Sequence, residues 1–165
     1  MQATLHPDGR FTARGFVFRA ALGRTGVSSS KREGDGATPA GLLPLRRVLY
    51  RADRVKAPEC VVSLEPIAPS DGWCDDPDHP DYNRHIRLPH PAHYEELWRS
   101  DSVYDIIGVL GWNDAPIHPG RGSAIFLHVA APDYSPTDGC IALALPDLRR
   151  VLASGLNGIL VLERG

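Results

Sequence analysis

The chain has 165 residues, enough for one domain whose hydrophobic core folds without disulfides or metals. Its 18 basic and 20 acidic residues are mixed along the chain and give a net charge of −2, so no basic stripe predicts nucleic-acid binding. No apolar run approaches the roughly 18 residues that a membrane-spanning helix needs, and we expect no membrane insertion. Three cysteines are too few for a disulfide scaffold and leave at least one thiol unpaired.

The first part of the chain predicts short strands separated by loops. Residues 11–22 alternate roughly between apolar and polar, which indicates a strand pair. Residues 23–41 are polar and glycine-rich and predict a long surface loop, with Lys31 and Arg32 at a solvated hairpin tip. Residues 42–52 fit a strand or a short helix equally well.

The middle of the chain is less regular. Residues 60–67 predict a strand. Residues 68–93 hold many Pro, Asp and His residues with little periodicity, and loops this long inside a domain tend to be functional. Residues 93–101 predict a short helix, whereas the β-branched run in residues 103–113 predicts a buried strand.

The last third predicts strands around one helix. Residues 123–130, 141–145 and 158–164 are apolar and strand-like. A helix is expected from Pro146 to Gly155, because proline suits a first turn and glycine a C-terminal stop. We therefore expect a single domain over residues 1–165, mainly β (α+β), with one or two short helices.

One pair of residues could carry chemistry. His128 stands at the end of a predicted strand, and a proline-bounded loop leads to Thr137, Asp138, Gly139 and Cys140. A neighbouring base turns a thiol into a useful nucleophile, and glycine lets consecutive backbone N–H groups point at an oxyanion. A buried structural cysteine and a hydrogen-bonded histidine are the alternatives, and the pair alone is weak evidence.

The segment resembles the catalytic motif of the L,D-transpeptidase (YkuD-like) family, which has a His, a spacer, then Ser/Thr-His-Gly-Cys. Further segments resemble the family in the expected order, in particular its short stand-alone subgroup. They are KREGDGATPAGLLPL, DDPDHPDYNRHIRLP, ELWRSDSVYDIIGVLGWND and PGRGSAIFLHVA. The resemblance spans most of the chain and implies a barrel-like or sandwich-like β domain.

The resemblance implies that Cys140 attacks a stem-peptide carbonyl of peptidoglycan and forms a thioester, with His128 as its base. The backbone carbonyl of Val129 would orient His128, and the N–H groups of Gly139 and Cys140 would form the oxyanion hole. An amine of a second stem peptide then receives the acyl group and forms a crosslink. No metal or organic cofactor is required.

Two positions depart from the family pattern. Asp138 stands where the family usually has His, and Ala142 where Arg or Asn is common. They put substrate recognition in doubt and leave two alternatives open. One is a cysteine carboxypeptidase or amidase that uses water as the acceptor, and the other is a catalytically weak peptidoglycan-binding module.

Residues of the irregular middle stretch could form a wall of the substrate groove. We single out Trp73, Tyr82, Asn83 and Arg84, with Arg84 meeting a stem-peptide carboxylate and Thr137 and Asp138 lining the groove. The alternative is a loop held by local hydrogen bonds and a salt bridge. Arg121 is expected in a turn near the site, where it could bind an anionic group.

Metals and disulfides are not expected. His79, His85, His90 and His93 fit no zinc spacing and are separated by prolines. Cys60 and Cys74 could pair, but free buried thiols explain them equally well.

The resemblance places the protein in the cell envelope or periplasm, with peptidoglycan stem peptides as partners. The first residues lack the apolar segment of a secretory signal, which leaves a cytoplasmic location open. We expect a monomer.

Overall fold

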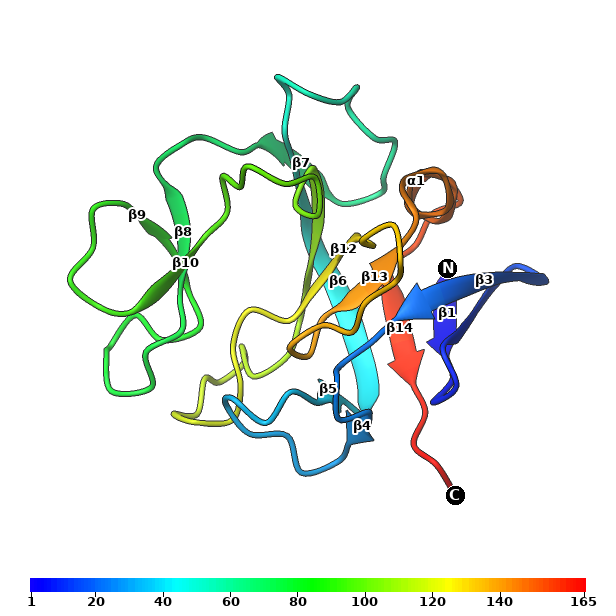
Figure 1. Ribbon diagram of the computed structural model, residues 1–165, viewed down its shortest axis with the longest axis horizontal. Helices are drawn as coiled ribbons and strands as arrows, with labels where there is room; N and C mark the ends of the chain where they lie inside the picture. The colour runs from blue at the N-terminus through cyan, green and yellow to red at the C-terminus, as the bar shows by residue number, and fades with distance from the viewer.

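The computed structural model describes all 165 residues and consists of fourteen strands and one α-helix (Figure 1). The elements are β1 (Gln2–Leu5), β2 (Arg10–Ala13), β3 (Phe16–Ala21), β4 (Val27–Ser28), β5 (Thr38–Pro39), β6 (Gly41–Tyr50), β7 (Ser63–Pro66), β8 (Asp71–Cys74), β9 (His85–Arg87), β10 (Tyr94–Glu96), β11 (Ile106–Leu110), β12 (Phe126–Val129), β13 (Ile141–Leu143), α1 (Leu145–Ala153) and β14 (Gly158–Val161).

The main sheet closes on itself. Its strand order is β11-β12-β13-β3-β2-β1-β14-β6-β7, and β11 also pairs with β6. The strands from β11 round to β6 therefore form a ring, and β7 extends it along the second half of β6. This mainly β, barrel-like arrangement is the fold class that the sequence predicts.

Strand alternation fills the ring with apolar side chains. Twenty-two buried residues form one core, which includes Phe11, Leu127 and Ile141, all without exposed surface. Because successive side chains of a strand point to opposite faces, the neighbours of Leu127 and Ile141 face outward from this core. A second core of ten buried residues lies on that outer side and includes Phe126 and Cys140.

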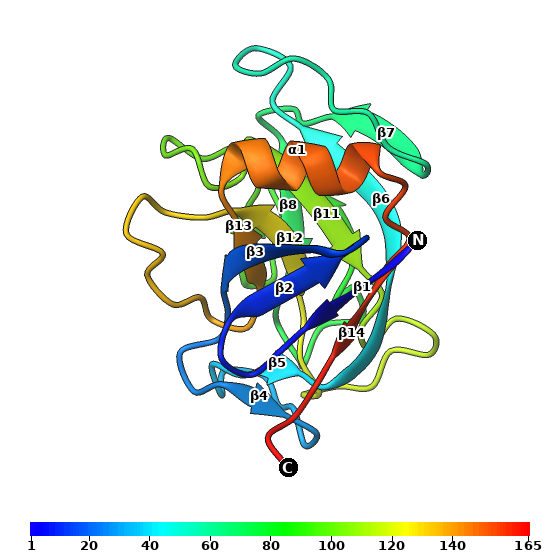
Figure 2. The same ribbon diagram turned by 90° about the vertical axis from the view of Figure 1, so that its right-hand side faces the viewer.

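The helix covers one end of the barrel (Figure 2). It starts at Leu145 with Pro146 in the first turn, buries Leu148, Val151 and Leu152, and is followed by Gly155 at φ +93°. The predicted helix and its terminal signals are thus confirmed. No helix in the structure has the length and apolar character needed to cross a membrane.

The prediction of a helix over residues 93–101 is wrong. Tyr94–Glu96 forms β10, which pairs with β8 in register Tyr94↔Cys74 and Glu95↔Trp73. Together with β9, these strands make a second, three-stranded sheet, of which β8 and β9 fall in the stretch expected to be irregular. The helix-forming residues of this segment adopt a strand because β8 offers backbone partners, a tertiary effect that overrides local propensity.

The expectation of a solvated Lys31 is also wrong. Its side chain is only 3% exposed and its Nζ lies 2.6 Å from Asp35 Oδ1. The surrounding loop contains the short strands β4 and β5 and packs against the chain near Cys140. Burial of Lys31 depends on this long-range packing, so local composition gives no sign of it.

Candidate active site

The pairing of β12 and β13 places Cys140 and His128 on the same face. The two strands are parallel, with Leu127 opposite Ile141 and His128 opposite Ala142. Leu127 and Ile141 belong to the barrel core, so His128 and Ala142 point outward. Cys140 lies two residues before Ala142 and therefore shares this outer face. Figure 1 shows β12 and β13 between the small sheet on one side and the N-terminal strands on the other.

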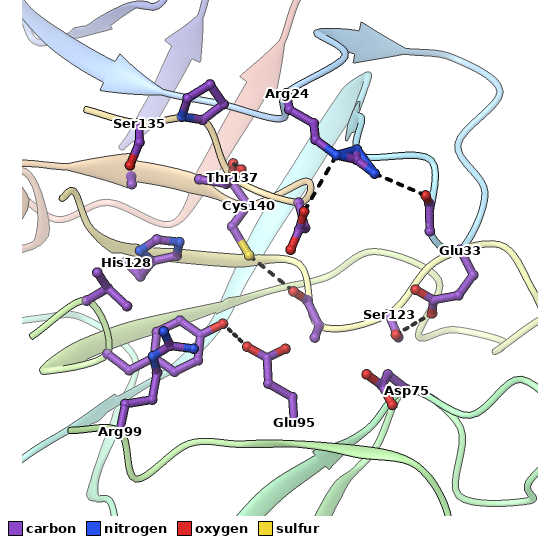
Figure 3. A pocket seen from close by; sticks show the side chains of 18 of the residues that line it. Arg24, Glu33, Asp75, Glu95, Arg99, Ser123, His128, Ser135, Thr137 and Cys140 are labelled. Carbon is purple, nitrogen blue, oxygen red and sulfur yellow. Dashed lines mark hydrogen bonds and ion pairs between the residues drawn. The ribbon is translucent and has the colours of Figure 1, made fainter. Parts of the chain in front are cut away.

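Both side chains line a cavity of about 690 Å³. Its walls come from β12 and β13, from the loop after β3, and from the small sheet. Figure 3 shows the charged side chains around Cys140. They are Arg24, Arg99, Glu33, Asp75, Glu95 and Asp138.

Cys140 is held as a thiol. It is 9% exposed, its Sγ–H donates to the carbonyl of Ala124 at 3.3 Å, and Phe126 N–H donates to Sγ at 3.4 Å. Burial, and then the charge of Glu95, raise the pKa of Cys140 to about 12. Attack by this sulfur therefore requires a base that takes the proton.

His128 is arranged as that base. Its Nδ1–H donates to the carbonyl of Val129 at 2.9 Å, which leaves Nε2 as the acceptor nitrogen. Burial lowers the pKa of His128, so the imidazole is neutral at pH 7. The ring of Tyr104 packs edge-on against it at 5.3 Å between centroids. Figure 3 shows the imidazole beside the Cys140 side chain, facing the same cavity.

The turn before Cys140 requires glycine. Gly139 has φ +138°, and a Cβ there would lie 2.8 Å from the Ala37 carbonyl oxygen. Thr137 Oγ1 donates to the Cys140 carbonyl at 2.6 Å and accepts the Gly139 N–H at 3.2 Å. In this state the Gly139 N–H is thus engaged within the turn. The Asp138 side chain is 97% exposed and lies 3.8 Å from Arg24.

Four predicted groove residues lie elsewhere. Trp73, Asn83 and Arg84 line a separate cavity of about 220 Å³. Asn83 is buried and joins the small sheet to the barrel, accepting from Trp73 Nε1 and Ala124 N. Tyr82 is buried and donates its hydroxyl to Glu33 at 2.7 Å. None of these four residues lines the cavity of Cys140 and His128.

Arg121 is also separate from the cavity of Cys140. It lines a surface depression beside Ser29 and Arg32. Its carbonyl accepts from Trp112 Nε1 at 2.9 Å. The structure thus brings together Cys140, His128, Thr137 and Asp138 from the predicted set, with Val129 and Gly139 supplying backbone groups.

His79, Asp81 and His90 are close enough to hold a metal ion. Both histidines, however, accept backbone N–H groups at Nδ1, from Asp81 at 3.0 Å and Ala92 at 3.1 Å. Their protons therefore lie on Nε2, and His90 Nε2 donates to Asp81 at 3.0 Å. Three of the four ring nitrogens thus take part in hydrogen bonds within this segment. Cys60 and Cys74 are free thiols.

Sequence reasoning missed several residues of the cavity. Glu95 and Arg99 fell in the segment read as a helix, and Tyr104 was read only as part of a strand. The Tyr104 hydroxyl donates to Glu95, and Arg99 packs over the Tyr104 ring at 5.2 Å. Arg24 was part of the predicted loop. Only the many charges around residues 93–101 could have drawn attention to this wall.

The comparison with protein families agrees with this geometry. A model of the L,D-transpeptidase catalytic domain, YkuD, matches residues 5–158. Neither curated proteins nor solved structures gave a significant match to the chain. The family match covers nearly the whole barrel and the cavity with Cys140 and His128. The chain therefore belongs to the YkuD family of L,D-transpeptidase catalytic domains, a family of peptidoglycan-modifying transferases.

Proposed function

We propose that the protein is a peptidoglycan L,D-transpeptidase that works through a thioester on Cys140. The observation that carries the proposal is the shared outward face of Cys140 and His128 in one cavity, with His128 Nε2 left as an acceptor. In the first half-reaction His128 takes the thiol proton while Sγ attacks a stem-peptide carbonyl. His128 then protonates the departing amine, commonly that of a terminal D-alanine in this family.

In the second half-reaction an amine of another stem peptide attacks the thioester. The C–N bond forms, the C–S bond breaks, and the thiol is restored. The backbone N–H groups of Gly139 and Cys140 are the candidates for stabilising the oxyanion in both steps. For Gly139 this requires release of the 3.2 Å hydrogen bond to Thr137. We place the protein in the cell envelope, where its substrate is found.

A hydrolase with the same residues is the second candidate. The almost fully exposed side chain of Asp138 and the small side chain of Ala142 favour it, because neither closes the cavity to water. Ala142 lies opposite His128 in register, where the longer residue common in the family would occupy part of the cavity. Water would then replace the amine as acceptor.

The test uses purified disaccharide tetrapeptide as donor and acceptor, with products followed by intact mass. We expect loss of D-alanine, a thioester adduct on the protein and a crosslinked dimer. All three should be absent with Cys140→Ala and present with Cys60→Ala, which removes a thiol far from the cavity. Loss of an amino acid without dimer would support the hydrolase. No adduct and no product with the wild-type protein would favour the catalytically weak peptidoglycan-binding module or an enzyme for a different donor stem.

A further inference from the structure

In the second half-reaction, one proton of the acceptor has no group assigned to accept it. An acceptor amine arrives as an ammonium and loses two protons when it becomes an amide. One proton ends on Cys140 Sγ and can pass through His128. The other must leave the ammonium before attack, because an ammonium has no lone pair. The cavity therefore needs a second group that binds the ammonium and takes its first proton.

Among the four acids of the cavity, three are occupied or remote. Asp75 is held by His93 at 2.5 Å, and the Asp138 side chain is almost fully solvated. Glu33 accepts the hydroxyls of Tyr82 and Ser123 at Oε1, and it is set aside because of its position. Figure 3 places Glu33 at the far end of the cavity from His128.

Glu95 differs from these acids. It is half-buried, it forms no ion pair, and the hydroxyl of Tyr104 is its one hydrogen-bond donor. Arg99 forms no ion pair with it, because its Nε and Nη2 bind Asp101 at 2.8 and 2.6 Å, although its positive charge acts to lower the pKa of Glu95. In Figure 3 the Glu95 carboxylate points into the cavity on the side of Cys140. One of its oxygens is thus free to meet a ligand.

The placement of Glu95 is unfavourable for the first half-reaction. Its negative charge is among the groups that raise the pKa of Cys140, and it lies where it would oppose a thiolate. The thioester is neutral, so this repulsion disappears once the acyl group is attached. A carboxylate beside the thioester is instead suited to attract a cation. Burial raises the pKa of Glu95 above its usual range, which brings the carboxylate closer to an amine in proton affinity.

We propose that Glu95 is the acceptor-site residue of this protein, binding the incoming ammonium and accepting its first proton. The inference rests on the proposed transferase function. The neutral amine then attacks the thioester carbonyl, and His128 takes the second proton from the attacking nitrogen and passes it to Sγ as the C–S bond breaks. Glu95 releases its proton to solvent. The Tyr104 hydroxyl positions the carboxylate.

The test compares Glu95→Gln with Glu96→Gln, an exposed neighbour on the same strand. Each protein receives the tetrapeptide donor, and thioester formation is timed by intact mass. Two acceptors then compete for the thioester: the tetrapeptide amine, an ammonium at pH 7, and hydroxylamine, which is already uncharged at that pH. For Glu95→Gln we expect thioester formation at least as fast as in wild type, because a charge that raises the pKa of Cys140 is removed. Hydroxamate formation should stay within about twofold of wild type, and dimer formation should be about 100-fold slower. Glu96→Gln should match wild type in all three.

Each other outcome has a distinct meaning. If dimer and hydroxamate formation fall together, or thioester formation falls, Glu95 maintains the shape of the site and the inference is overturned. Unchanged dimer formation in Glu95→Gln overturns it as well. If the wild-type protein forms no thioester, or forms one that only water resolves, the transferase proposal itself fails. Melting temperatures of the variants show whether any loss reflects unfolding.

Discussion

Twenty-two buried apolar residues fill the barrel, whereas the sheet of β8, β9 and β10 has an apolar core of only three, Cys74, Ile86 and Ala92. The small sheet packs on the barrel through Trp73 and Leu97 of the second core, and polar contacts add to this packing. His85 bonds Asp71 at 2.9 Å, and Asn83 bonds both the sheet and the barrel. The barrel carries the candidate pair Cys140 and His128, and the small sheet contributes charged residues to the opposite wall of the cavity. The candidate catalytic pair thus lies on the region with the large apolar core, and part of the charged wall lies on the region with the small one.

The same substitution in the two regions tests this contrast most directly. Ile159→Ala in β14 removes a fully buried side chain from the barrel and should lower the free energy of unfolding by about 4 kcal/mol. Ile86→Ala in β9 should cost only about 2 kcal/mol, because the thin layer around it can collapse. Urea unfolding measures the loss in the free energy of unfolding for both variants. Equal losses would show that the two regions form one equally packed core.

Replacement of His128, the proposed base, should slow the reaction of Cys140. His128→Gln should slow thioester formation about 100-fold, because nothing else takes the proton of a thiol whose pKa is raised to about 12. The rate in this variant should climb as pH rises, since hydroxide then generates the thiolate. Quenched reactions between pH 6 and 10, analysed by intact mass, measure the rate of thioester formation. A rate close to wild type at pH 7 would assign the proton to another group.

Loss of the Asn83 side chain should weaken the contact between the small sheet and the barrel. Its side chain accepts from Trp73 and Ala124 and donates to the carbonyls of Trp112 and Asn113. Asn83→Ala leaves the buried N–H groups of Trp73 and Ala124 and the partly buried carbonyls without these partners, and should destabilise the protein by about 2 kcal/mol. Hydrogen exchange should rise first in β8 and β9. Asn157→Ala, at an exposed position, serves as the control and should change stability by less than about 0.5 kcal/mol.

The pH dependence reports the base in the free enzyme. His128 must be neutral to accept the thiol proton, and burial lowers its pKa from the ordinary value of 6.5. Activity should therefore persist as pH falls through 6.5 and disappear only below it. The acid limb of the pH profile of kcat/KM for the donor gives the pKa of His128. A midpoint above 6.5 would contradict a neutral, desolvated His128.

The smallest effect is expected at Asp138, outside both cores. Its side chain is almost fully exposed and only 3.8 Å from the half-exposed Arg24. Asp138→Asn should change the free energy of unfolding by less than about 0.5 kcal/mol, because such surface pairs contribute little. Thermal unfolding checks this. A loss above 1 kcal/mol would mean that the turn depends on this charge.

The sequence predicts the barrel better than the small sheet, for a physical reason. Apolar alternation marks the strand pair in residues 11–22, and Pro146 and Gly155 bound the helix. The motif also identifies Cys140 and His128, which the structure places on one face. By contrast, β10 is polar and its local propensity favours a helix, so its structure depends on pairing with β8. Glu95 becomes part of the cavity only through that pairing.

The close packing behind Gly139 restricts how this site can be redesigned. Its Cα hydrogen faces the Ala37 carbonyl, and the ammonium of Lys31 lies close to the same position. The turn at residues 137–140 therefore packs directly against another segment of the chain. Grafting the four turn residues onto a different barrel would transfer the thiol but lose the surface that shapes the turn. A successful transplant has to carry residues 31–38 as well, and natural variation in the two segments has to be coupled.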